Sequence, residues 1–329
     1  MKRYQVVGIG NAVVDVITRS EDSFLDQMGI EKGIMQLVER DRAESLYDAM
    51  QERLQAPGGS VANTLAGLGN LGLKTAFIGR VKDDELGRFY SGAMEEFGTK
   101  FINDPVAEGE LPTSRCMIFV SPDGERSMNT YLGISSELGP DDVDESVAAE
   151  SEVVFLEGYL FDKDKGKDAF IRTARACRGA GGKAGIAISD PFCVERHRDD
   201  FLKLIENDLD YVIGNEAEIR ALYQNDDLDA DLKAVAEICP LVVCTRSGDG
   251  VSIIRDGVRT DIAVEKSVPV DATGAGDQFA AGFLYGLATG ADMETCGRMG
   301  HAAAGEVISH MGPRPETSLP DLFKQKGLI

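Results

Sequence analysis

Short apolar runs that alternate with amphipathic helical patterns constrain the fold of this chain more than any other feature. The β-rich runs lie at residues 4–10, 75–81, 153–159, 183–190, 211–215 and 241–247. Helical patterns separate them at 60–72, 84–98, 164–178, 196–206 and 215–224, with another before residue 238. Several runs are apolar throughout, as expected of strands covered on both faces. The alternation predicts an α/β fold, a three-layer α/β/α sandwich with a mostly parallel central sheet.

Two regions break this alternation. Residues 12–40 contain the short strand-like runs AVVDVITR and GIMQLVER, and residues 112–135 have the pattern of a hairpin around the turn SPDG. Apolar and polar residues alternate in these strands, so we expect a small β-sheet that covers one side of a cleft as a lid. An ordinary extension of the edge of the main sheet is the alternative. Both regions are expected to belong to one domain that comprises residues 1–329.

Composition excludes several classes of function. The formal net charge of −22 argues against binding to nucleic acid, which needs clustered Lys and Arg. No apolar stretch is long enough for a membrane helix, and the first residues lack the long apolar region of a signal peptide, so a cytoplasmic protein is expected. The six cysteines form no C-x-x-C pair and are expected to be reduced and mostly buried.

The stretch VDATGAGDQFAAGFLYG, residues 270–286, predicts a helix that begins near Gly274. The first turn of a helix has unpaired N–H groups and a partial positive charge. Gly274 and Gly276 have no side chain to keep a ligand from that backbone. The stretch therefore predicts a binding site for an anion such as a phosphate.

Asp277 lies in the same turn, where an acid would repel a phosphate. One interpretation is an acid that only stabilises the helix dipole. The other is a general base that accepts the proton of an attacking hydroxyl group, next to a phosphoryl group that mainly needs positioning and neutralisation.

A second glycine pair precedes another helix in APGGSVANTLAGLGNLG, residues 56–72. The backbone of Gly58 and Gly59, together with the Asn63 amide, can bind the hydroxyl groups of a polyol. Two other glycine motifs fail: an extra residue spoils the P-loop pattern at 67–75, and Val13 replaces the third glycine of a dinucleotide motif at 8–13. A nicotinamide-dependent oxidoreductase is thus a minor alternative.

Together these stretches resemble the ribokinase-like, or PfkB-type, family of carbohydrate and nucleoside kinases. The resemblance extends from GIGNAVVDV near the start to EVISHMGPRP near the end. GGSVANTLAGLGNLGLKTAFIGRVKDDELG resembles the N-terminal signature of the family, and DATGAGDQFAAGF resembles its C-terminal signature. The length, GNAVVDV and ERSMNTYLG are similar to the adenosine-kinase-like branch. The resemblance implies the ribokinase-like fold with a small β-sheet lid.

The resemblance also implies roles for residues of the transfer site. Asp277 matches the catalytic base. The anion hole of the family corresponds to the backbone of Gly274, Ala275 and Gly276. The residues that contact substrate hydroxyl groups in the family correspond to Asp15, Gly58, Gly59 and Asn63. Arg126 matches an arginine of the lid that reaches the phosphates in some members.

On the nucleotide side, NEAE matches the N-x-x-E element of the family. Asn215 and Glu218 are therefore expected to organise Mg²⁺ and its waters with the phosphates of ATP, and carboxylate and water ligands suit Mg²⁺. The strand and turn that lie beside the nucleotide in the family correspond to Thr245, Ser247 and Gly250. Ala272 and the glycine spacing of TRSGDG depart from the family pattern, which leaves the seating of ATP and a monovalent-cation site, such as one for K⁺, open.

The acceptor favoured by this resemblance is a nucleoside, adenosine first, phosphorylated on its 5′-hydroxyl. The alternative is a sugar kinase acting on ribose, fructose or 2-keto-3-deoxygluconate, and a non-catalytic sugar- or nucleotide-binding protein is a remote third. The candidates for residues that line a specificity pocket are Met35, Leu37, Met117, Phe119 and Tyr131. Packing in the core is the better explanation for each of them. A monomer and a homodimer formed through the lid both remain open.

Overall fold

A nine-stranded sheet forms the centre of the computed structural model, which describes residues 2–265 and 267–329. Its strand order is β14 (Val258–Ile262), β13 (Val251–Arg255), β12 (Leu241–Thr245), β11 (Tyr211–Asn215), β10 (Lys183–Ala187), β9 (Ser151–Glu157), β1 (Tyr4–Ile9), β5 (Thr75–Ile78) and β6 (Thr99–Phe101). Neighbours from β12 to β6 pair in parallel, and β13 and β14 form an antiparallel edge. The predicted α/β fold with a mostly parallel sheet is confirmed.

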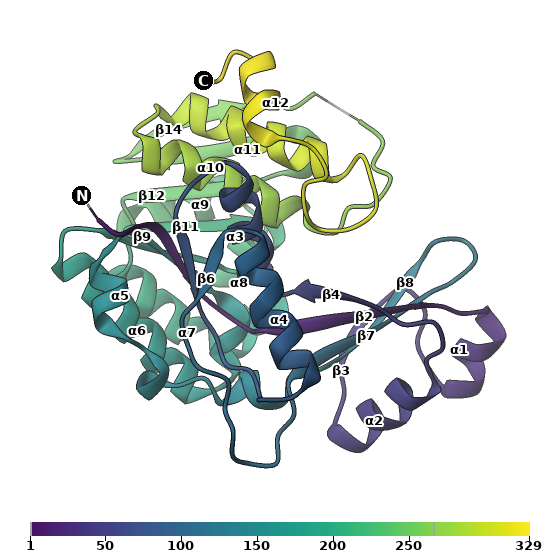
Figure 1. Ribbon diagram of the computed structural model, residues 1–329. Coiled ribbons are helices and arrows are strands. Elements are labelled where there is room, and N and C mark those ends of the chain that lie inside the picture. Colours follow the sequence, from purple (N-terminus) through teal and green to yellow (C-terminus); the bar gives the residue numbers. More distant parts are fainter. Residues whose placement is uncertain (1, 266) are drawn as a thin grey trace.

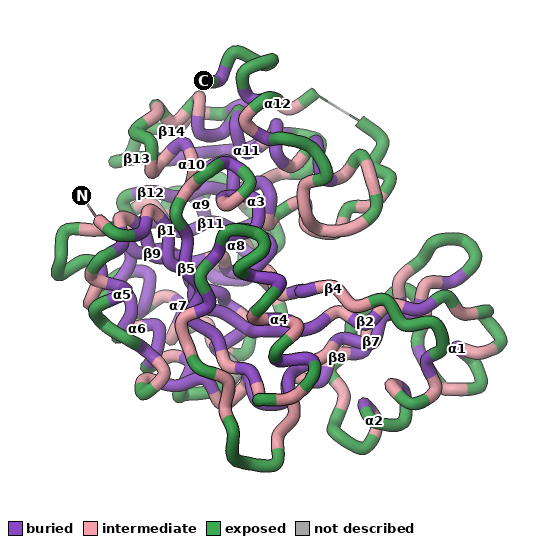
Figure 2. The backbone as a smooth tube through the Cα atoms, in the orientation of Figure 1, coloured by how far each residue is buried: buried purple, intermediate pink, exposed green. Residues whose placement is uncertain are grey.

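Helices cover both faces of this sheet (Figure 1). The first face packs against α3 (Ser60–Asn70), α4 (Glu85–Glu96), α10 (Ala275–Thr289) and α11 (Met293–Val307). The second face packs against α5 (Glu145–Ala149), α6 (Asp164–Gly179), α7 (Pro191–Asp208), α8 (Glu216–Tyr223) and α9 (Leu228–Ile238). Figure 2 shows the buried backbone concentrated between these layers. Because neighbouring residues of a strand point to opposite faces, Val6 joins the first core and Val7 the second.

A second sheet of five strands projects beside the first (Figure 1). Its order is β3 (Met35–Leu37), β8 (Arg126–Tyr131), β7 (Ser114–Val120), β2 (Val13–Arg19) and β4 (Leu54–Gly58). The helices α1 (Asp22–Met28) and α2 (Arg40–Ala49) contribute Leu25 and Leu46 to the buried cluster that holds its residues. The strand β4 lies outside the segments 12–40 and 112–135, and Gly59 joins it directly to α3.

Several expectations about single elements need correction. The helix expected at 196–206 matches the second part of α7, which has a kink at His197 with a φ of −128° and a ψ of 25°. The first part was not predicted; it begins at Pro191, because Asp190 caps it by accepting hydrogen bonds from two backbone N–H groups and proline suits a first helical turn. Met117, Phe119 and Tyr131 are core residues as expected, but Met35 and Leu37 are 42% and 55% exposed on the edge strand β3.

The prediction for the cysteines is confirmed, since all six are buried. None of the helices in the described part of the chain combines the length and the apolar character that crossing a membrane requires.

Close packing between α10 and α11 sets the position of the helix that begins at the predicted anion site. A Cβ at Gly282 of α10 would overlap the backbone carbonyl of Met299 on α11. We expect Gly282→Ala to lower the free energy of unfolding by about 1–3 kcal/mol, because two backbones must move apart. Chemical denaturation would measure this loss.

Gly305→Ala is the matched control, since Gly305 lies on α11 and its Cβ would meet no atom within 4 Å. We expect this variant to be as stable as the wild type or more stable by up to about 1 kcal/mol, because alanine favours a helix. Equal stability of the two variants would contradict the packing argument.

Candidate active site

Asp277 lies in the first turn of α10, where side chains from the first turn of α3 hold it. Ser60 Oγ donates to Asp277 Oδ1 at 2.7 Å, and Asn63 Nδ2 donates to Oδ2 at 3.0 Å. Thr64 Oγ donates to the backbone carbonyl of Asp277 at 3.1 Å. The side chain and the backbone of the predicted base are therefore both positioned by the helix that follows the second glycine pair.

The surroundings of Asp277 adjust its pKa toward neutrality. Burial raises the pKa of this carboxyl to about 6, and the hydrogen bonds from Ser60 and Asn63, with the charge of Arg314, oppose the rise. A carboxylate with this pKa is ionised at pH 7 and is still basic enough to accept a proton.

The backbone around Gly274 forms a left-handed turn into α10. Gly274 precedes the helix with a φ of 80°, and a Cβ there would lie 2.5 Å from Pro313 Cα. The Ala275 N–H donates to the Ala272 carbonyl at 3.2 Å. Among the described residues, the N–H groups of Gly276 and Asp277 have no hydrogen-bond partner, and a Cβ at Gly276 would meet nothing within 4 Å. Among the described residues the Gly274 N–H also has no hydrogen-bond partner, so two of the predicted trio, Gly274 and Gly276, have free donors, and Asp277 adds a third.

Asp15 and the glycine pair lie together at the start of the second sheet. A Cβ at Gly58 would come within 2.5 Å of Asp15 Oδ1, and Gly59, with a φ of 96°, would bring its Cβ to 2.5 Å from the Asn11 carbonyl oxygen. Burial raises the pKa of Asp15 to about 7, while the positive charges of Arg314 and Arg126 act to lower it. A side chain at either glycine would thus collide with a neighbouring group, the Asp15 carboxyl at Gly58 and the Asn11 backbone at Gly59.

Arg126 of β8 contacts the loop in front of α10. Its Nη2 atom forms an ion pair with Asp271 Oδ2 at 3.4 Å. Asp271 also accepts hydrogen bonds from the Gly312 N–H at 2.9 Å and from Thr273 Oγ at 2.7 Å. The pair joins the second sheet to the loop that leads to the free N–H groups.

The predicted nucleotide residues line the carboxyl ends of β11 and β12. Asn215 and Thr245 are neighbours in the parallel register of these strands. Asn215 Oδ1 accepts from the Glu218 N–H, and the Glu218 carboxylate accepts from the N–H and Nδ2 of Asn215 at 2.9 and 2.7 Å. Ser247 and Gly250 shape the turn after β12, with φ angles of 47° and 94°.

The acidic groups near this turn fit a magnesium ion that is bound mainly by phosphates and water. Among the described residues, no group of three or more His, Cys, Asp or Glu side chains could hold a metal ion alone. Burial raises the pKa of Glu218 to about 7, and the negative charges of Asp190 and Asp277 contribute. Mg²⁺ is typically held by one or two carboxylates plus substrate phosphates, so this arrangement suits it.

Sequence reasoning missed four residues that the structure brings to the site: Ser60, Glu157, Asp271 and Arg314. Glu157 accepts from the N–H and Nδ2 of Asn11 at 3.2 and 2.7 Å and from the Val61 N–H at 3.3 Å. An acid at the end of an apolar strand was a signal for Glu157, and Asp271 stands within the DATGAGD stretch. Arg314 stands in EVISHMGPRP, the last stretch quoted for the family resemblance, but no pattern in that stretch singled it out.

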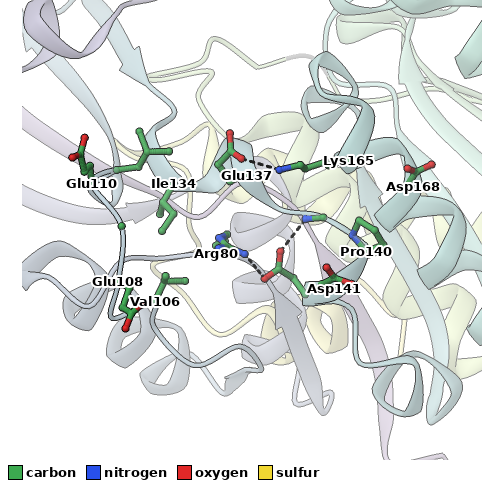
Figure 3. Close-up of a pocket in the computed structure, with 14 residues that line it drawn as sticks. Arg80, Val106, Glu108, Glu110, Ile134, Glu137, Pro140, Asp141, Lys165 and Asp168 are labelled. Atoms are coloured by element: carbon green, nitrogen blue, oxygen red, sulfur yellow. Dashed lines mark hydrogen bonds and ion pairs between the residues drawn. The ribbon is translucent and has the colours of Figure 1, made fainter.

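A cavity of about 470 Å³ is lined by a different set of residues (Figure 3). Its lining includes Arg80, which bonds Asp142 at 2.6 Å, and Lys165, which pairs with Glu137. None of the predicted site residues lines it. The cavity is therefore not part of the candidate active site. The charges of Arg80 and Lys165 are paired with carboxylates of the same lining.

Comparison with known proteins identifies the family. A model of the pfkB family of carbohydrate kinases matches residues 32–321. The chain belongs to this family. It is therefore a phosphotransferase with an alcohol group as acceptor, and the resemblance inferred from the two signatures is confirmed.

Solved structures and a curated relative of this kinase carry different names. A probable sugar kinase from Rhizobium etli is 44% identical with a TM-score of 0.91, and all of each chain is covered. The adenosine kinase from Sinorhizobium meliloti is 44% identical with a TM-score of 0.90 over 98% of this chain and 99% of that one. A 5-dehydro-2-deoxygluconokinase from Shouchella clausii is 27% identical over 83% of this chain and 86% of its own length.

The buried carboxyl groups of the kinase predict opposite effects of pH on activity and stability. Asp277 has a pKa of about 6, and Asp15, Glu157 and Glu218 have pKa values of about 7, all raised by burial. As the pH falls from 8 to 5, Asp277 becomes protonated, so the prediction that Asp277 is the base implies a fall in kcat/KM. The melting temperature is expected to rise, because the folded state binds protons that the unfolded state does not bind until about pH 4.

Steady-state kinetics and thermal melting across this pH range would measure both effects. Added salt is the control for the general repulsion of a chain with a net charge of −22. A melting temperature that falls steadily from pH 8 to 5 at high salt would contradict the raised pKa values.

Proposed function

We propose that this protein is an ATP-dependent nucleoside kinase that phosphorylates the 5′-hydroxyl of adenosine. One observation carries the kinase chemistry: Asp277 and the unpaired N–H groups of Gly276 and Asp277 share the first turn of α10. The choice of adenosine is supported by the 44% identity to the Sinorhizobium meliloti adenosine kinase across nearly the whole chain. Because the co-substrate is ATP, we infer that the protein acts in the cytoplasm.

A sugar kinase is the second candidate. The Shouchella clausii relative is named a 5-dehydro-2-deoxygluconokinase, and the equally similar Rhizobium etli structure is named a probable sugar kinase. Both candidates use the same transfer chemistry and differ only in the acceptor.

In the proposed reaction, Asp15 and the backbone near Gly58 bind hydroxyl groups of the acceptor, with the primary hydroxyl directed at Asp277. Asp277 accepts the proton of that hydroxyl as its oxygen bonds to the γ-phosphorus of ATP. The bond from that phosphorus to the β–γ bridging oxygen breaks, and ADP leaves. The N–H groups of Gly276 and Asp277 donate to the oxygens of the transferred phosphoryl group, whose charge they stabilise.

Asn215 and Glu218 are proposed to hold the waters of a magnesium ion on the nucleotide side. Bound there, Mg²⁺ would neutralise phosphate charge. Thr245, Ser247 and Gly250 are proposed to contact the nucleotide. The five-stranded sheet is proposed to act as a lid, and the Arg126–Asp271 ion pair connects it to the transfer site. Closure would exclude water and so limit hydrolysis of ATP without an acceptor.

Replacing the base tests the mechanism. We expect Asp277→Asn to fold normally and to lose about 10²–10⁴-fold in kcat, because the amide cannot accept the proton. Coupled ADP release under saturating MgATP would measure the loss. Asp321→Asn is the matched control, since Asp321 is an exposed acid in the first turn of α12 (Leu319–Gln325). Turnover near the wild-type rate in Asp277→Asn would sink the assignment of the base.

A panel of acceptors tests the substrate. ADP release would be compared for adenosine, guanosine, inosine, ribose, fructose, 2-keto-3-deoxygluconate and 5-dehydro-2-deoxygluconate at equal concentrations. We expect adenosine to give the highest kcat/KM. A higher value with any sugar would replace the nucleoside by the second candidate and leave the mechanism in place.

A further inference from the structure

Arg314 is held beside the site by the segment between α11 and α12. Gln278 Nε2 donates to the Pro313 carbonyl at 3.0 Å and to the Asn63 carbonyl at 2.9 Å. Further along, the Thr317 N–H donates to Glu306 Oε1 at 2.9 Å. These bonds anchor the segment on both sides of Arg314, to α10, which carries Asp277, and to α11, which carries Glu306.

A chain of two hydrogen bonds connects Arg314 to the proposed base. Arg314 Nε donates to Asn63 Oδ1 at 3.2 Å, and Asn63 Nδ2 donates to Asp277 Oδ2 at 3.0 Å. Arginine has no acceptor atom, so the amide of Asn63 must direct its oxygen to Arg314 and its NH₂ group to Asp277. The guanidinium lies over the ring of Phe97, 4.6 Å from its centre, which fixes its plane.

The positive charge of Arg314 acts on Asp277, which has several acidic groups around it. Carboxyl groups of Asp15 on β2, Glu157 on β9 and Glu218 on α8 interact electrostatically with Asp277, as does Tyr159. Arg314 is the cation that acts on both Asp15 and Asp277, while Arg126 acts on Asp15.

The outer nitrogens of Arg314 strengthen this effect. Nη1 and Nη2 are buried and have no hydrogen-bond partner among the described residues. Their charge is therefore not cancelled by a direct ion pair. Because these nitrogens are buried, water screens their interaction with the carboxylates of Asp15 and Asp277 only weakly.

We propose that Arg314 is a positioning residue for the general base: through Asn63 it orients the Asp277 carboxylate, and its charge keeps that carboxylate ionised. The inference rests on the proposed role of Asp277 in catalysis. It adds a residue that neither the two signature stretches nor the N-x-x-E element contains.

Two variants separate the orientation from the charge. Arg314→Gln keeps a donor for Asn63 Oδ1 and removes the charge, whereas Arg314→Lys keeps both a donor and the charge. The readout is the acid side of the pH profile of kcat/KM with the best acceptor. We expect Arg314→Gln to move that limb to higher pH by on the order of 1 unit, because a nearby cation no longer favours the ionised base. Arg314→Lys should restore it to the wild-type position.

An acid limb of Arg314→Gln that coincides with the wild-type limb would overturn the inference, whatever happens to the maximal rate. So would an equal displacement in Arg314→Lys, because charge would then not be the cause. Arg3→Ala, an exposed arginine over the ring of Tyr4 at the far end of β1, is the matched control and should leave the profile unchanged. Melting temperatures would confirm that each variant is folded.

Asp277→Asn, measured in parallel, separates this inference from the function on which it rests. Turnover near the wild-type rate in Asp277→Asn would refute the proposed base and this inference together. An inactive Asp277→Asn with an unmoved limb in Arg314→Gln would refute the role of Arg314 alone.

Discussion

The hydrogen bonds that α3 donates to Asp277 are the interaction on which the site depends. Ser60 and Asn63 occupy the first turn of one helix and Asp277 the first turn of another, 217 and 214 residues away in sequence. Each of these turns follows a glycine with a left-handed φ, Gly59 and Gly274. The two glycine pairs that looked like separate motifs are thus two halves of one constraint, which brings a carboxylate and free N–H donors to the same place.

Packing makes this constraint rigid. The helix α10 carries Asp277 and contacts α3 on one side and α11 on the other, with Gly282 allowing the backbones of α10 and α11 to approach. Gln278, the neighbour of Asp277, is fully buried and bonds both Asn63 and Pro313. A carboxylate placed by so many contacts needs little rearrangement when a substrate binds, and such preorganisation is what phosphoryl transfer mainly requires from a protein.

Burial explains why the acids of this site differ from surface acids. Asp15, Glu157, Glu218 and Asp277 have pKa values raised toward neutrality by desolvation, and raised values in a group of converging carboxyls are typical of functional sites. The second sheet contributes charged groups to the site, because Asp15 lies on β2 and Arg126, which pairs with Asp271, lies on β8. The second sheet therefore supplies charges of both signs.

The sequence by itself determined the layered architecture and the two glycine motifs, because strand and helix periodicity and the conformational demands of glycine are local properties. It also indicated Asp277, which stands in one of those motifs, and, through the family resemblance, Asp15 after the first strand. Only the tertiary structure decided which groups hold Asp277. Arg314 lies 37 residues after Asp277 in a stretch that resembles the family but assigns it no role, and Glu157 ends a strand that lies between others. Their partners are distant in sequence, so their contacts exist only once the helices have packed on the sheet.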